Sequence, residues 1–316
     1  MSNDDPRKLA PDHPVRSRKL PWFTEFAPDK LTPYARQLFE EYSGIPPEDV
    51  ESHILQVRDL AWDICPWPCI GEFWFVSFGL RRHNHYGRLV SFLKSTPEST
   101  DDSKLPPTFL DLGTCVGQDV RALLYDGVPI SRLYGSDILP GFEGAGHALF
   151  KDANRFTPEH FIVGDIFDTN PETSPLAKTA GTWSVVNIIM FLHLFNLDES
   201  EIVCTNILKL LRPEPGSFVI GAQTGTLNAG ELVVPPPLVD PGVHKVIYRH
   251  NRETMIDMWK RVGEKLGIEL KVWADYDQDE MRERQARTEA DPDWDKKHRF
   301  FSGKEERRIF FLVERV

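Results

Sequence analysis

The chain has 316 residues, of which 41% are hydrophobic and 11% aromatic, so it is large enough for a sizeable core and too apolar to be intrinsically disordered. Its formal net charge of -11 opposes the phosphate attraction that dominates nucleic-acid binding, and no apolar stretch approaches the ~20 residues of a membrane-spanning helix. We therefore expect neither a nucleic-acid nor a membrane partner, and the lack of a signal-peptide pattern favours a cytoplasmic protein.

The first hundred residues are predicted to be mostly helical. Residues 1–20 mix Pro, Asp, Arg and Lys without periodicity, which is typical of a flexible tail. Apolar residues at three- and four-residue steps predict two amphipathic helices between Thr32 and Leu60. An aromatic block, Trp62 to Phe78, precedes a predicted helix from Arg81 to Leu93, while Ile70 to Phe78 fits either a short helix or a strand.

A turn-rich linker, Pro97 to Pro107, predicts a boundary between a helical cap or lid over residues 21–100 and a core over residues 101–316. In the core, short apolar runs alternate with helical stretches, which predicts an α/β fold with helices on both faces of a largely parallel sheet. The expected strands are Thr108–Leu112, Arg132–Ser136, Phe161–Val163, Thr182–Met190, Ser217–Ala222, Glu269–Trp273 and Arg308–Val313. The expected helices are Gln118–Tyr125, Phe142–Phe150, Asp198–Leu211 and Arg252–Leu266. The charged stretch Asp275 to Arg307 is expected to be a solvated excursion rather than a binding arm.

The most informative motif is the segment Asp111 to Gly117, in which an apolar strand runs into a glycine-containing turn that opens a helix. Such a turn lets a ligand approach backbone N–H groups at a helix N-terminus. Gly113, Cys115 and Gln118 occupy the places where a dinucleotide fingerprint has three glycines, and no P-loop Lys-Ser/Thr pair is present. The turn therefore suits a cationic cofactor without phosphate better than a pyrophosphate.

Acidic residues also follow the next two strands of the predicted sheet. Asp137 ends the second strand, where a carboxylate can accept both hydroxyls of a ribose. Asp165 ends the third, and with Ile166 it can bind the amine of an adenine and sandwich its ring. Each acid alone is as readily a turn or helix cap. Three acidic strand ends in order favour a nucleoside-containing cofactor.

With its segments DLGTCVG, YGSDI and VGDIF, followed by VVNIIMFLHLF, the chain resembles class I S-adenosylmethionine-dependent methyltransferases over about residues 105–316. The resemblance implies a Rossmann-like seven-stranded sheet with an antiparallel last strand and S-adenosylmethionine as cofactor. It also implies cofactor-binding roles for Asp111, Gly113, Thr114, Cys115, Gly117, Asp137, Ile138, Asp165, Ile166, Asn187 and Ile188.

The whole chain further resembles fungal O-methyltransferases of polyketide and meroterpenoid biosynthesis. The similarity lies in the helical cap with its aromatic block, in Phe191 to Phe195, and in Tyr248 to Asn251 before a helix. It implies an enzyme of secondary metabolism, active as a homodimer, that methylates a carboxyl of a small apolar and acidic natural product. A phenolic hydroxyl is the open alternative for the acceptor.

Candidate residues on the acceptor side are less sharply defined. His193 is the candidate catalytic residue because a phenol gains from a nearby base, whereas a carboxylate is already ionised at pH 7; a histidine satisfied in the pocket wall is equally plausible. Aromatic side chains at such density are more often core than substrate contacts, and Arg249 and His250 are more often surface turn residues than ligands. The candidates for substrate contact are Trp62, Trp74, Tyr86 and His250.

Two rival functions are compatible with the same motifs. A methyltransferase-fold protein can catalyse a cyclisation or isomerisation without methyl transfer, or serve as a non-catalytic regulatory partner. The intact acids Asp111, Asp137 and Asp165 argue against the second. Cys65 and Cys69 lack further ligands at zinc spacing, so no metal site is expected.

Overall fold

The structure, a computed structural model, describes residues 6–26, 28–95, 105–240, 242–293 and 305–316. The chain divides into two compact units, Met1–Thr179 and Ala180–Val316. The domain limits expected near residues 20 and 100 stay predictions, and most of the expected linker, residues 97–104, lies outside the described residues.

The cap region of the first unit is made of short helical segments. The first expected helix is α1 (Pro33–Gln37), which begins with Thr32 as its N-cap and continues into a π-helical turn, Leu38–Tyr42. The second is α2 (Val50–Ile64), whose inward positions recur at the expected helical period. The aromatic block, Trp62 to Phe78, contains the short helix α3 (Pro68–Gly71) and a 3-10 turn, Trp74–Val76, and no strand. Helix α4 (Tyr86–Lys94) follows it.

The described part of the first twenty residues packs against α2. Val15 is buried, the indole Nε1 of Trp62 donates a hydrogen bond to the carbonyl of Arg16 (3.1 Å), and the Arg16 guanidinium donates to the carbonyl of Asp63 (2.8 Å). A buried indole N–H needs an acceptor, and the tail supplies it. This contact has no periodic signature, which is why the sequence predicts only a flexible tail.

The strands of the first unit are parallel. They are β1 (Phe109–Leu112), β2 (Leu133–Asp137) and β3 (Phe161–Val163), with β2 hydrogen-bonded to both of the others. Helices α5 (Gln118–Tyr125) and α6 (Gly141–Phe150) form the two crossovers. Every residue of β1 is buried, as expected for a parallel strand covered on both faces.

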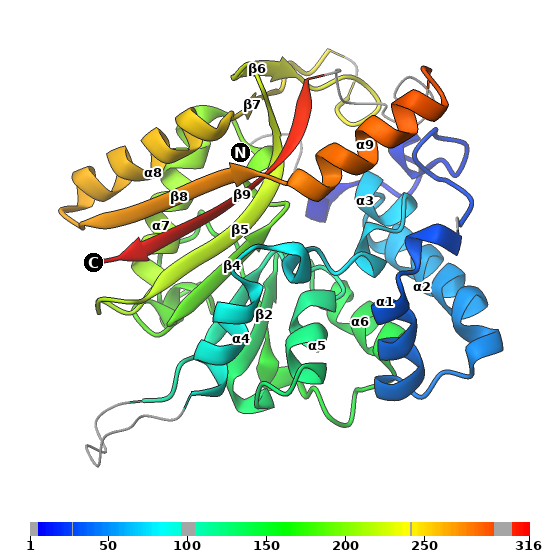
Figure 1. The fold of residues 1–316 in the computed structure, drawn as a ribbon, viewed down its shortest axis with the longest axis horizontal. Coiled ribbons are helices and arrows are strands. Elements are labelled where there is room, and N and C mark those ends of the chain that lie inside the picture. Colours follow the sequence, from blue (N-terminus) through cyan, green and yellow to red (C-terminus); the bar gives the residue numbers. More distant parts are fainter. Residues whose placement is uncertain (1–5, 27, 96–104, 241, 294–304) are drawn as a thin grey trace. The chain divides into compact units, whose positions relative to one another are not determined.

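The second unit holds β4 (Val185–Ile189) parallel to β5 (Phe218–Thr226). The last strand, β9 (Glu306–Arg315), runs antiparallel between β5 and β8 (Leu270–Tyr276), as Figure 1 shows. The strand order of the seven-stranded sheet is β3-β2-β1-β4-β5-β9-β8. The expected α/β fold class, with seven strands and the last one antiparallel, is therefore confirmed.

Helix α7 (Leu197–Leu210) connects β4 to β5, and α8 (Arg252–Leu266) precedes β8. A separate hairpin of β6 (Gly230–Val233) and β7 (Val246–Arg249) was not predicted, because its short strands lack a clean apolar alternation. Helix α9 (Gln278–Ala290) lies within the stretch expected to be a solvated excursion. Most residues of α9 are exposed, as this expectation requires, and Asp277 caps the helix by accepting hydrogen bonds from two backbone N–H groups.

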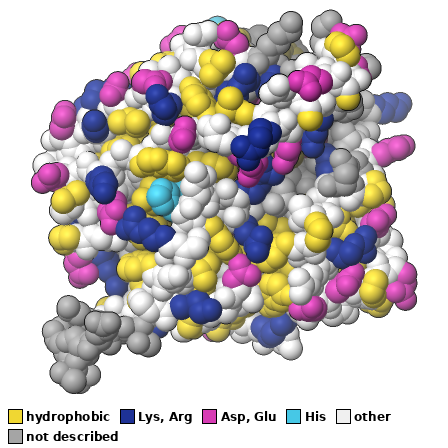
Figure 2. Space-filling model, viewed as in Figure 1, with side chains coloured by type: hydrophobic (Ala, Val, Ile, Leu, Met, Phe, Trp, Pro, Cys, Tyr) yellow, Lys and Arg dark blue, Asp and Glu magenta, His cyan; other side chains and the backbone are white. Residues whose placement is uncertain are grey.

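The surface carries mixed charge. On the face shown in Figure 2, acidic and basic side chains are interspersed with apolar ones. Among the described helices, none is both long enough and apolar enough to cross a membrane.

Candidate functional site

The turn after β1 is held by hydrogen bonds to both neighbouring segments. The backbone N–H groups of Gly113 and Thr114 both donate to the carbonyl of Ser136 on β2, at 2.8 and 3.0 Å. The Thr114 hydroxyl donates to Oδ2 of Asp111 (2.7 Å), the buried acid of β1. Asp111 and Thr114 therefore stabilise the turn itself.

The same turn needs three left-handed residues, Gly113, Cys115 and Gly117, with φ of 74°, 51° and 70°. A Cβ at Gly117 would lie 2.2 Å from Nη1 of Arg121, so this glycine is required both by its backbone and by space. A left-handed residue other than glycine costs about 1–3 kcal/mol. The hydrogen bond from the Cys115 N–H to Asp137 (3.0 Å) offsets part of that cost.

Asp137, at the end of β2, connects the turn to the start of the next crossover. Its Oδ2 accepts from Cys115 and its Oδ1 accepts from the N–H of Leu139, both at 3.0 Å. Burial raises the pKa of Asp137 to about 6, although these backbone hydrogen bonds oppose the rise. The carboxylate is therefore mostly ionised at pH 7 and loses its charge just below that pH.

Asp165 and Ile166 follow β3, where the N–H of Gly164 donates to the carbonyl of Asp137 (3.1 Å). The Asp165 Oδ1 accepts from the N–H of Phe167 (3.0 Å), and its Oδ2 forms an ion pair with Arg7 (3.3 Å). Ile166 is buried, whereas Ile138 after β2 is half-buried. The structure thus brings the acids of the first three strand ends into one connected turn region of the first unit.

A buried ion pair that the sequence did not reveal supports this region. Arg121 of α5 binds Asp152 through two hydrogen bonds, Nε to Oδ2 (3.0 Å) and Nη2 to Oδ1 (3.2 Å). Tyr42 donates its hydroxyl to the same carboxylate (2.7 Å), and the His147 Nδ1 lies 3.2 Å from it. Because the guanidinium also passes directly beside Gly117, this network fixes the turn against α5.

The aromatic candidates for substrate contact have different partners and different exposure. Trp62 is only 1% exposed, and its indole N–H donates to the carbonyl of Arg16. Trp74 is 44% exposed and donates its indole N–H to Glu72 (2.8 Å). Tyr86 donates its hydroxyl to Asp126 (2.7 Å), which follows the far end of α5 from the Gly113 turn. The structure therefore places Trp62 in the core, and the substrate contacts expected for these three residues stay predictions.

In the second unit, Asn187 and Ile188 are fully buried in the middle of β4. Neither side chain reaches a surface, so their expected role beside a cofactor stays a prediction.

His193 lies in a 3-10 turn, Leu192–Leu194, just beyond the carboxyl end of β4. Its Nδ1 is buried and has no hydrogen-bond partner among the described residues. Burial, together with the positive charge of Arg249, lowers the pKa of His193 to about 3. The imidazole is therefore neutral over the whole physiological range.

Arg249 ends β7 and His250 follows it. The expectation that both are surface turn residues is wrong: the Nη1 of Arg249 and the Nε2 of His250 are buried and find no partner in the described part of the chain. His250 lies 3.1 Å, through Nδ1, from the Thr254 hydroxyl in the first turn of α8. Burial is the main cause that lowers the pKa of His250 to about 4.

One further polar residue was missed. Gln223 of β5 is fully buried, and neither its Oε1 nor its Nε2 has a hydrogen-bond partner within the described ranges. Nothing in a strand-like sequence distinguishes such a glutamine from one that is satisfied by its neighbours. Burial of an amide without hydrogen bonds destabilises the folded state, so Gln223 is a candidate for binding a ligand.

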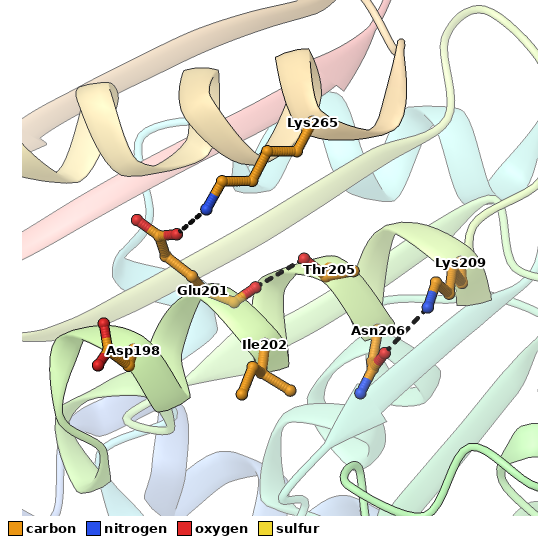
Figure 3. A pocket seen from close by; sticks show the side chains of 7 residues that line it. All are labelled: Asp198, Glu201, Ile202, Thr205, Asn206, Lys209 and Lys265. Carbon is orange, nitrogen blue, oxygen red and sulfur yellow. Dashed lines mark hydrogen bonds and ion pairs between the residues drawn. The ribbon is translucent and has the colours of Figure 1, made fainter.

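A depression of about 420 Å³ on the second unit is lined by residues of α7 and by Lys265 of α8 (Figure 3). Two of its charged groups are paired with each other, because Glu201 accepts a hydrogen bond from Lys265 as well as from Arg261. It contains none of the residues predicted for the site.

Comparison with known proteins identifies the family. Residues 22–76 match the family model described as the meroterpenoid methyltransferase N-terminal domain. The chain is 35% identical to O-methyltransferase atr3 of Stereocaulon alpinum over 84% of this chain and 72% of that one. It is 36% identical to O-methyltransferase phiE of Fungal sp. (strain ATCC 74256), over 81% and 79% of the two chains.

The Asnovolin E/Chermesin D methyltransferase nvfJ of Aspergillus novofumigatus is 31% identical, over 67% of this chain and 72% of its own. Relatives this similar over most of both chains confirm the enzyme class expected from the strand-end motifs, and the chain belongs to the fungal O-methyltransferase family.

Proposed function

We propose that this enzyme uses S-adenosylmethionine to methylate a carboxyl group of a small, largely apolar polyketide or meroterpenoid intermediate. The single observation that carries the choice of acceptor is a neutral His193 near the half-buried Arg249, whose Nη1 is buried, in the second unit. The family model and the relatives support the broader class of substrate.

S-adenosylmethionine supplies an electrophilic methyl group on a sulfonium. The first unit fits such a cationic ligand, because Asp111, Asp137 and Asp165 lie at or near the carboxyl ends of its three strands. No basic residue lies between Asp111 and Gly117. The Gln118 Oε1, at the first position of α5, is buried without a hydrogen-bond partner in the described chain and suits a ligand ammonium group. The Asp137 carboxylate suits the ribose hydroxyls as a hydrogen-bond acceptor. Asp165 and Ile166 suit the adenine, which the aspartate would bind through its amine and the isoleucine would contact through its ring.

The acidity of His193 favours a carboxylate over a phenol. A base whose conjugate acid has a pKa of about 3 lies roughly 7 pK units below a phenol, so proton transfer from the phenol to His193 is strongly unfavourable. A carboxylate acceptor needs no base, since it is ionised at pH 7. His193 then orients the acceptor oxygen and helps to exclude water, and positioning of this kind is the main contribution a protein makes to an in-line displacement.

The test is transfer of a labelled methyl group to a panel of alkylated aromatic polyketide acids. Mild alkaline hydrolysis releases the label from an ester but not from a phenyl ether. We expect the label to be base-labile. A base-stable product would assign the transfer to a hydroxyl, and unlabelled products of changed skeleton would favour the cyclisation alternative.

A further inference from the structure

We propose that Arg249, Gln223 and His193 form a recognition site for a planar carboxylate of the acceptor. The inference rests on the proposed function and deepens it, because it names the side chains that bind the group to be methylated. All three belong to the second unit.

The backbone brings their segments together. The N–H of Tyr248 donates to the carbonyl of Phe195 (2.9 Å), which places β7 against the turn that carries His193. Arg249 is close enough to His193 for its charge to lower the histidine's pKa.

Gln223 lies between two contacts made by the same segments. On one side, the carbonyl of Ala222 accepts from the N–H of Met190, at 2.6 Å. On the other, the N–H of Thr226 donates to the carbonyl of His250, at 2.9 Å. The stretch of β5 that carries Gln223 is therefore flanked by the segment leading to His193 and by the residue following Arg249.

The three side chains present complementary unpaired groups. The buried atoms are Nη1 of Arg249, Oε1 and Nε2 of Gln223, and Nδ1 of His193. None of them makes a hydrogen bond to a described residue. A guanidinium offers parallel donors that match the two oxygens of a carboxylate, the Gln223 Nε2 offers another donor, and a neutral imidazole donates from whichever nitrogen carries the proton. A ligand with two acceptor oxygens satisfies groups that the protein leaves unsatisfied.

Charge and surroundings restrict the ligand further. Arg249 is the cation of this cluster, and the carboxylate of Glu306 interacts with it electrostatically, so the cluster suits a monoanion better than a phosphate dianion. Aromatic rings lie beside it: Phe191 and Phe195 are 5.4 Å apart, and the Tyr248 and His250 rings 4.7 Å apart. A carboxylate attached to an apolar skeleton fits both features.

The experiment compares 4-hexylbenzoate with 4-hexylbenzamide as ligands for the full chain saturated with S-adenosylhomocysteine, using calorimetry. The two probes have the same shape and differ in charge. We expect the carboxylate to bind at least tenfold more tightly than the amide. Arg249→Gln should remove this preference, Arg249→Lys should retain part of it because the charge remains without the planar fork, and Gln223→Met should weaken carboxylate binding several-fold.

Arg252→Gln is the matched control, because Arg252 is exposed, pairs with Glu253, and lies three positions from Arg249. It should behave as wild type. Equal affinities for the two probes, no binding of either one, or an unchanged preference in Arg249→Gln overturns the inference. If Arg249→Gln does not fold, the Arg249→Lys result decides. Failure of wild type to bind S-adenosylhomocysteine would instead overturn the proposed function, so the two failures are distinct.

Discussion

At the scale of single residues, the role proposed for Asp137 predicts that cofactor binding depends on pH. Its folded pKa of about 6 lies above the ordinary value of 3.8, so the carboxylate becomes protonated as the pH falls through 6. A protonated carboxyl accepts hydrogen bonds from ribose hydroxyls less well. We expect the affinity for S-adenosylhomocysteine, measured by calorimetry between pH 5 and 8, to fall below pH 6.

Asp137→Asn should bind S-adenosylhomocysteine at least tenfold more weakly at pH 7.5 and should lack the inflection near pH 6. Asp168→Asn is the control, since Asp168 is an exposed acid whose carboxylate accepts hydrogen bonds from Asn170 and Thr173 of its own turn. An inflection that survives in Asp137→Asn would assign the titration to another group.

His193 gives a second residue-level prediction, for the rate of methyl transfer. Because burial and Arg249 hold the pKa of His193 near 3 and the acceptor carboxyl is ionised, neither group titrates between pH 6 and 8. We expect kcat with a carboxylic acid acceptor to be flat over this range, and His193→Asn to lower it by roughly tenfold or less, as for a residue that orients without removing a proton. A rate that rises tenfold per pH unit, and loses that slope in His193→Asn, would contradict this role.

The residues that could be predicted are those that follow a strand in the sequence. Asp111, Asp137 and Asp165 stand at recognisable strand ends, and the structure connects them. Asp152 and Gln223 could not be predicted. The importance of Asp152 comes from partners distant in the chain, and that of Gln223 from the lack of a hydrogen-bond partner among the residues that the structure describes. Neither property leaves a local pattern.

At the scale of elements, α5 owes its position to the pair of Arg121 and Asp152. Both side chains are almost wholly buried, so removing one leaves the other as an uncompensated buried charge, at a cost of about 3–5 kcal/mol. We expect Asp152→Ala to lower the free energy of unfolding in urea by this amount and to weaken S-adenosylhomocysteine binding through the Gly117 turn.

Asp279→Ala provides the comparison, because Asp279 pairs with Arg282 on the exposed surface of α9. Its effect should stay within about 0.5 kcal/mol. Equal losses in the two variants would mean that the buried pair does not support α5.

Element boundaries were predicted best where capping residues mark them. The bounds of α8 were predicted from residue 252 to 266, because Asn251 forms a capping box at one end and Gly267 adopts φ of 66° at the other. The hairpin of β6 and β7 was missed although it carries Arg249, since neither strand buries a full apolar face. Residues 294–304 of the charged stretch lie outside the described residues.

For the whole molecule, two buried histidines predict sensitivity to acid. The folded pKa values of His193 and His250, about 3 and 4, lie below the ordinary 6.5, so the unfolded chain binds protons first as the pH falls. Their contribution to the free energy of unfolding is complete above pH 6.5. It is lost as the pH falls from 6.5 to the folded pKa of each histidine, at about 1.4 kcal/mol per histidine per pH unit. Asp137 acts in the opposite sense, because its raised pKa adds stability as the pH falls from 6 to 3.8.

The histidines outweigh Asp137, so we expect the urea midpoint to be lower at pH 5.0 than at pH 7.5. His250→Gln should reduce the difference between the two midpoints, since it removes one of the two groups. A midpoint that is unchanged or higher at pH 5.0 would show that the histidines are solvated in the folded state.

Quaternary structure is a further proposal at this scale. We propose a homodimer, as the resemblance to the biosynthetic enzymes implies. Light scattering on the purified chain should give twice 36.2 kDa. A mass of 36.2 kDa at micromolar concentration would favour a monomer.

The contact between Arg7 and Asp165 has a practical consequence for work on this enzyme. Arg7 lies six residues from the first methionine, and its partner is the acid proposed for the adenine. An affinity tag fused at the amino terminus adds foreign chain only a few residues from this pair. Ligand titrations made before and after removal of such a tag should therefore differ.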